Sequence, residues 1–327
     1  MITREDLIYF GKRLTKKYYI IGREHGGAGF FSNYMWVLAH VIFAVKHGFV
    51  PVVDMEHFKT LYSEEEPIEG TENAWNYYFE NVSSVTLQEA YESGRYLMSK
   101  DTPYHDLISR YCEGTYRLPT AKAVAYYAPL INRFLKIRPD LKAEMERRWM
   151  DRIQGGEESG KGGETLMPTV LGVHVRGTDM KNNLGHPMPA PGETYWKKVC
   201  EILEKHPEID TVFLATDEVA TIRLFQEESE TFANSKGRRV RLIMNDSFRA
   251  EPTSDEKKTG IHELAVTDPR DRHKYLLGLE VLEDAYDLSR CDYLLCGHSN
   301  ITNVVLMWNN RQFREAICIG EHLDIRL

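Results

Sequence analysis

The second half of the chain alternates short, apolar, β-prone segments with segments that have a helical apolar period. This order restricts the possible folds more than any other feature of the sequence. Two parallel strands need a long crossover connection, which is usually a helix. The alternation therefore predicts an α/β fold built on a parallel sheet. The expected strands are 170–176, 211–215, 239–244, 293–296 and 316–319, and the expected helices are 193–205, 219–228, 272–288 and 301–309.

A strand, a glycine-rich loop, a helix and a second strand follow one another near the start of the chain. The strands are expected at 18–21 and 49–53, and together with the helix they predict a βαβ unit. Gly26, Gly27 and Gly29 lie in the loop. Because glycine has no side chain, this loop can approach another group closely or adopt positive φ angles.

The same loop is expected to bind the anionic part of a ligand, because it directs backbone N–H groups and a helix N-terminus toward one place. Ser32 or Asn33 is expected to cap that helix. The glycine spacing matches neither the dinucleotide fingerprint nor the P-loop. A tight turn without a ligand is the alternative interpretation.

Residues 154–167 read QGGEESGKGGETLM, which is rich in glycine and charge and has no apolar period. This composition is typical of a flexible linker. We therefore predict two domains, an N-terminal α/β domain at 1–160 that contains the glycine loop and a C-terminal Rossmann-like domain at 161–327. The aromatic residues at 75–79 are expected to lie in the core and not to stack on a sugar.

The composition excludes several classes of function. The net charge of -8 over 327 residues argues against broad contact with nucleic acid or with an anionic membrane. No apolar run reaches the roughly 20 residues of a membrane span. The five scattered cysteines indicate reduced thiols, and the charged N-terminus lacks a signal core. We therefore expect a cytoplasmic protein whose oligomeric state the sequence leaves open.

The segment PTVLGVHVRGTD at 168–179 is a buried strand that ends in polar residues. An arginine at the end of a central strand is costly to bury unless it meets an anion, and ligands bind at this edge of α/β sheets. The planar guanidinium of Arg176 suits phosphate. Alternatively, Arg176 pairs with an internal carboxylate such as Asp179.

Polar residues follow three of the expected strands, and the strand ends of a parallel sheet share one edge. In the group at 297–300, Ser299 and Asn300 precede a helix and form either a phosphate cradle or an ordinary cap. Asp217 has the same capping alternative. No D-x-D sequence is present, so a metal-bound diphosphate lacks its usual carboxylate pair. The three groups are His174, Arg176 and Asp179; Thr216, Asp217 and Glu218; and Gly297, His298, Ser299 and Asn300.

Four segments resemble, in order, the motifs of the α1,6-fucosyltransferases, a family that includes the bacterial nodulation fucosyltransferases. They are GVHVRGTD, HPMPAPGETYWKKV, VFLATDE and LEDAYDLSRCDYLLCGHSNITNVVLMW. The loop and helix HGGAGFFSNYMWVLAHVIFA also resemble this family. The resemblance implies a GT-B fold, with two Rossmann-like domains facing across a cleft. It places the acceptor side in the domain at 1–160 and the donor nucleotide in the domain at 161–327. It also implies an inverting, metal-independent transfer of fucose from GDP-fucose to a carbohydrate acceptor, without a cofactor.

The resemblance assigns roles residue by residue. Arg176 corresponds to the arginine that grips the donor diphosphate, His174 to the histidine near guanine and ribose, and Asp284 to the aspartate that reads guanine. Ser299 corresponds to the serine that contacts phosphate, and Asp217 to the aspartate of the A-[TS]-D strand. The donor-binding set is therefore Gly26, Gly27, Gly29, Asn33, His174, Arg176, Asp217, Asp284, Ser299 and Asn300, and the catalytic pair is Arg176 and Asp179.

The chain departs from the family at two positions. Gly177 replaces the second arginine of the family's Arg-Arg pair, and Met180 replaces its lysine. The catalytic base is not carried over either, and Asp179, His186 and Glu193 are the candidates. Two alternatives follow from these departures: the fold uses another nucleotide sugar, or it binds a nucleotide sugar without catalysis.

Overall fold

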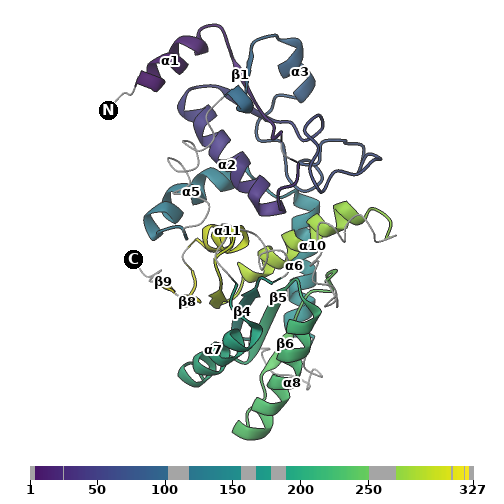
Figure 1. The fold of residues 1–327 in the computed structure, drawn as a ribbon, viewed down its shortest axis with the longest axis vertical. Coiled ribbons are helices and arrows are strands. Elements are labelled where there is room, and N and C mark those ends of the chain that lie inside the picture. Colours follow the sequence, from purple (N-terminus) through teal and green to yellow (C-terminus); the bar gives the residue numbers. More distant parts are fainter. Residues whose placement is uncertain are drawn as a thin grey trace. The chain divides into compact units, whose positions relative to one another are not determined.

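A computed structural model of the chain describes residues 4–24, 26–101, 118–155, 167–177, 189–249, 270–310, 312–319 and 321–323. Contacts between Cα atoms divide the chain into two compact units. The first contains Met1–Leu141 and Asp271–Gly278, and the second contains Lys142–Arg270 and Leu279–Leu327. Each unit has its own parallel sheet (Figure 1).

The first unit contains the predicted βαβ arrangement. Strand β1 (Tyr18–Ile21) lies between β2 (Val50–Val53) and β3 (Tyr96–Met98), and it is parallel to both. Helix α2 (Phe30–Lys46) connects β1 to β2 and has thirteen buried residues among its seventeen. A helix that is apolar on most sides belongs in a core, so α2 packs deeply. The other helices are α1 (Arg4–Arg13), α3 (Leu87–Glu92), the 3₁₀ turn η1 (Ser99–Asp101) and α5 (Ala121–Phe134).

The second unit contains a sheet in the order β6-β5-β4-β7-β8-β9, with every pair parallel except β8 and β9. The predicted strands are confirmed within about three residues at each end, and β9 is an addition. The strands are β4 (Val170–Val175), β5 (Thr211–Thr216), β6 (Arg241–Ile243), β7 (Tyr293–Cys296), β8 (Glu315–Cys318) and β9 (Glu321–Leu323). The helices are α6 (Pro139–Gln154), α7 (Gly192–Lys205), α8 (Val219–Lys236), α10 (His273–Leu288) and α11 (Asn300–Asn309), of which α6 and α10 each begin in the first unit.

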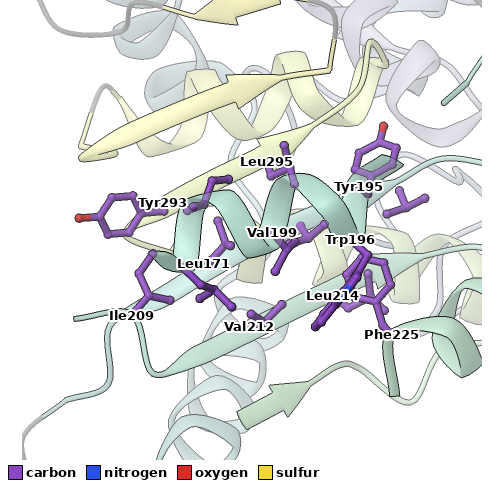
Figure 2. Packing of buried hydrophobic residues seen from close by; sticks show 14 of the residues in the cluster. Leu171, Tyr195, Trp196, Val199, Ile209, Val212, Leu214, Phe225, Tyr293 and Leu295 are labelled. Carbon is purple, nitrogen blue, oxygen red and sulfur yellow. The ribbon is translucent and has the colours of Figure 1, made fainter. Parts of the chain in front are cut away.

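Helix α7 covers one face of this sheet and forms the main apolar core of the unit (Figure 2). Trp196 and Val199 of α7 lie in one buried cluster with Leu171 of β4 and Val212 of β5. All six residues of β4 are buried, as its apolar sequence predicts for a central parallel strand. This packing holds the carboxyl ends of β4, β5 and β7 in fixed register.

The division into units differs from the predicted boundary at 160/161, because it falls inside α6. The cause is the apolar face of this helix: Met145, Trp149 and Ile153 are buried, and the Trp149 ring packs edge-on against Phe213 of β5, with the ring centroids 5.6 Å apart. The predicted linker residues 156–166 lie outside the described residues. The boundary at 160/161 remains a prediction.

Two further expectations concern the whole chain. In the described ranges, none of the helices combines the length and the apolar character that crossing a bilayer requires. No disulfide bond joins the described cysteines, which are Cys200, Cys291, Cys296 and Cys318.

Candidate functional site

The glycine loop of the first unit leads directly into α2. Gly29 is the N-cap of this helix, with an extended conformation and no side-chain hydrogen bond. The predicted capping by Ser32 or Asn33 is therefore wrong, because the helix begins three residues earlier than that prediction requires.

Asn33 and Arg23 tie the loop to the start of α2. The Nδ2 of Asn33 donates to the carbonyl of Ala28 at 3.2 Å, and the Nη1 of Arg23 donates to Oδ1 of Asn33 at 3.1 Å. The guanidinium of Arg23 also lies 5.0 Å from the centre of the Trp36 ring. A cation held over an aromatic ring beside a loop of backbone N–H groups makes the loop locally positive. Arg23 was not predicted, although it stands directly before the loop.

The aromatic residues 75–79 lie in the core, as predicted. Trp75, Tyr78 and Phe79 are buried, and with Phe30 and Tyr62 they line a small pocket that also touches Asn33. The Tyr62 hydroxyl accepts a hydrogen bond from the N–H of Phe30 at 2.8 Å. The aromatic cluster therefore supports the first turn of α2.

Close backbone packing explains only one of the three loop glycines. A Cβ on Gly26 would lie 2.5 Å from the carbonyl oxygen of Lys59, whereas a Cβ on Gly27 would meet nothing within 4 Å. We therefore expect Gly26→Ala to destabilise the protein by about 1–3 kcal/mol, because the backbone must move. Gly27→Ala is the matched control and should change little. Thermal unfolding of the two variants checks this, and equal stabilities would contradict it.

At the carboxyl edge of the second sheet, Arg176 pairs with Asp217. The Nη1 of Arg176 lies 2.9 Å from Oδ2 of Asp217, and Oδ1 of Asp217 accepts a hydrogen bond from the N–H of Gly177 at 3.0 Å. The structure thus contains an internal ion pair of Arg176, formed with Asp217. Arg176 remains partly exposed, with 27% of its side chain accessible.

His174 of β4 lies close to the turn before α11, which follows the neighbouring strand β7. The Oγ of Ser299 accepts from the N–H of Thr302 at 3.0 Å, which makes Ser299 the N-cap of α11. The Thr302 hydroxyl lies 3.5 Å from Nδ1 of His174. Burial and, to a lesser extent, the charge of Arg176 lower the pKa of His174 to about 4. His174 is therefore neutral at neutral pH, with one ring nitrogen able to donate and the other able to accept.

The position of Gly177 is covered by an acidic side chain. A Cβ on Gly177 would lie 2.1 Å from the carboxyl carbon of Glu218, so the carboxylate occupies the space a larger residue would need. The Thr221 hydroxyl donates to this carboxylate at 3.1 Å. Glu218 thus places a negative charge beside the Arg176 and Asp217 pair.

Asp284 lies on α10 and contacts Asn245, the second residue after β6. The Nδ2 of Asn245 donates to Oδ1 of Asp284 at 2.8 Å. Burial raises the pKa of Asp284 to about 7, against the opposing effects of Arg249 and Asn245. A carboxyl group with a pKa near neutrality beside the carboxyl ends of the strands is a candidate functional group. Asn245 and Arg249 were not predicted: Asn245 directly follows the expected strand 239–244, and Arg249 lies farther along the chain.

The structure describes some of the remaining predicted residues but not others. Asp179 and His186 lie outside the described residues, whereas Glu193 lies exposed in the first turn of α7. Asn300 is the first residue of α11, and its Oδ1 atom is buried without a hydrogen-bond partner in the described part of the chain. Gly26, Gly27, Gly29 and Asn33 belong to the first unit, and the other described site residues belong to the second.

Comparison with known proteins identifies the fold. Neither a protein-family model nor a curated protein matches the chain. Among solved structures, it is similar to the NodZ alpha-1,6-fucosyltransferase co-crystallised with GDP, with a TM-score of 0.50 and 16% identity over 92% of this chain and 94% of that one. It is also similar to fucosyltransferase NodZ from Bradyrhizobium (TM-score 0.49, 16% identity, 92% and 96% coverage). A third similar structure is POFUT1 in complex with GDP (TM-score 0.44, 8% identity, 94% and 99% coverage). At these identities, the comparison with the first structure shows a shared fold, and the predicted α/β fold of GT-B type is confirmed.

Proposed function

We propose that this protein is a glycosyltransferase that transfers fucose from GDP-fucose to a carbohydrate acceptor, with inversion and without a metal ion. One observation carries the proposal: polar side chains from β4, β5 and α11 gather at the carboxyl edge of a parallel sheet whose fold is shared with a GDP-bound fucosyltransferase. Ligands of open α/β sheets bind at this edge.

The proposed roles follow from the chemistry of each group. The carboxylate of Asp284 accepts hydrogen bonds from the N–H groups on the edge of guanine. Arg176 and the N-terminus of α11 at Ser299 and Asn300 stabilise the charge that develops on the leaving diphosphate. Neutral His174 offers a hydrogen bond to the nucleoside. Inversion requires a base for the acceptor hydroxyl, for which Asp179, His186 and Glu193 remain the candidates.

A second candidate function is the binding of a nucleotide sugar without transfer. The pairing of Arg176 with Asp217 and the carboxylate of Glu218 over Gly177 favour this reading, because both add negative charge near the proposed diphosphate position. Such a protein would bind GDP but would neither transfer the sugar nor hydrolyse the donor. Use of a different nucleotide sugar is the nearest enzymatic alternative.

Calorimetric titration of the purified protein with GDP, GDP-fucose, UDP and ADP, in the absence of added metal, tests the proposal. We expect binding of GDP and GDP-fucose alone. Binding of UDP or ADP in place of GDP, or no binding at all, would overturn the proposed donor. Incubation with GDP-fucose and a panel of carbohydrate acceptors then separates a transferase from a protein that only binds.

A further inference from the structure

Arg249 is a cation at the carboxyl edge of the second sheet that the predicted site does not include. Its Nε donates to the carbonyl of Thr216 at 3.2 Å, its Nη1 to Ser247 at 2.6 Å and its Nη2 to Asn245 at 2.6 Å. Thr216 is the last residue of β5 and pairs with Val175 of β4. The guanidinium is therefore fixed at the strand end next to Arg176.

The two arginines at this end of the sheet differ in their hydrogen-bonding partners. Asp217 forms an ion pair with Arg176, and the carboxylate of Glu218 lies over Gly177. Arg249, in contrast, is partly buried, and its hydrogen bonds within the described residues are to neutral carbonyl oxygens. A partly buried cation whose hydrogen bonds in that part of the chain are to neutral groups is further stabilised by an anion that arrives with a ligand.

The hydrogen-bonding capacity of the guanidinium leaves room for such an anion. Arginine has five N–H donors in a planar fork, and the three bonds to carbonyl groups use one donor on each nitrogen. One N–H on Nη1 and one on Nη2 remain for an acceptor. Two N–H groups of one guanidinium can bind two oxygens of a phosphate group.

We infer that Arg249 binds the diphosphate of the nucleotide sugar, an inference that rests on the proposed function. The three carbonyl contacts orient the fork before the ligand arrives, so little side-chain entropy is lost on binding. Because Asp217 partly neutralises Arg176, Arg249 supplies further positive charge for the diphosphate. Arg249 lowers the pKa of Asp284, against the effect of burial, which agrees with a position near the carboxylate that is proposed to bind guanine.

The test compares ligands that differ only in phosphate. GDP, GMP and guanosine are titrated into the wild type, Arg249→Gln, Arg249→Lys and the control Arg238→Gln. Arg238 is a matched control because its guanidinium also donates to backbone carbonyl groups, those of Leu203 and Ile209, but at the opposite end of the sheet. The loss of a charged hydrogen-bonding partner should lower GDP affinity about tenfold or more in Arg249→Gln.

Comparing GDP with guanosine distinguishes a role of Arg249 in binding the diphosphate from a role in folding. We expect the affinity for guanosine to be the same in Arg249→Gln as in the wild type, and Arg249→Lys to lose less GDP affinity than Arg249→Gln. Equal losses for GDP and guanosine, or no loss for either, would overturn the inference. If Arg249→Gln does not fold, the same comparison is made with Arg249→Lys, which keeps the charge but not the fork. A wild type that binds no GDP would instead overturn the proposed function.

Discussion

Replacing Arg152 with methionine is expected to lower the free energy of unfolding at pH 9 by about 3–5 kcal/mol, because it leaves the buried, ionised carboxylate of Asp287 without its cation. The Nη1 of Arg152 on α6 lies 2.7 Å from Oδ2 of Asp287, and its Nη2 lies 3.2 Å from Oε1 of Glu283, both on α10. The side chain of Asp287 is 0% exposed and that of Glu283 is 7% exposed. For a unit of this size the melting temperature should fall by roughly 10 °C.

The control for this change is Arg147→Met on the same helix. Arg147 pairs with Glu144 and Asp151, but its side chain is 59% exposed, so the variant should melt like the wild type. Adding Asp287→Asn to Arg152→Met should restore part of the lost stability, since the uncompensated charge is then gone. If Arg152→Met and Arg147→Met melt at the same temperature, the buried pair does not stabilise the unit.

The effect of Arg152→Met should also depend on pH. Burial raises the pKa of Asp287 to about 8, and the Arg152 guanidinium opposes that shift. Without Arg152, Asp287 takes up a proton more readily, which relieves part of the cost at low pH. The variant should therefore differ from the wild type more at pH 9 than at pH 6, as thermal unfolding at the two pH values would show.

The second large effect is expected from Asp284→Asn, which should weaken GDP binding and stabilise the free protein at pH 8. In the proposed guanine site the ionised carboxylate accepts N–H groups of the base, whereas an amide offers a single acceptor oxygen. Because the pKa of Asp284 is raised to about 7, GDP affinity of the wild type should fall as the pH is lowered from 8 to 6. Below the pKa the fall approaches tenfold for each pH unit, and the variant should show little of it.

The stability change has the opposite sign. A carboxyl group whose pKa is raised on folding stabilises the folded state at low pH, and this contribution is lost as the pH rises through the folded pKa. For Asp284 the loss occurs as the pH rises from about 4 to 7. At pH 8 the wild type therefore carries the cost of a buried charge that Asp284→Asn removes. Stability and binding should move in opposite directions, as is common at functional sites.

Calorimetry with GDP and thermal unfolding, each between pH 6 and 8, measure both effects. Asp210→Asn is the control, because Asp210 is exposed and directly precedes β5 at the amino end of the sheet. It should change neither quantity. GDP affinity in Asp284→Asn equal to that of the wild type would remove Asp284 from the proposed guanine site, and a lower melting temperature at pH 8 would show that the carboxylate is structural.

Local patterns in the sequence were sufficient for the architecture. The apolar run of β4 and the helical period of α7 depend on residues close in the chain, and both elements formed where predicted. The boundaries were less accurate. Helix α8 extends to Lys236 instead of ending near Glu228, because Gly237, in a left-handed conformation, ends it. The capping role of Ser32 or Asn33 failed because the aromatic packing of Phe30 extended α2 toward the loop.

What the sequence determined by itself was the α/β order of elements and the presence of polar residues at the strand ends, since period and strand position are local properties. Only the tertiary structure decided which charges meet. It paired Arg176 with Asp217, placed the carboxylate of Glu218 over Gly177, and held Arg249 at the end of β5. These contacts join residues about 30 to 40 positions apart, and their pairing depends on strand order and on burial, neither of which a local pattern encodes.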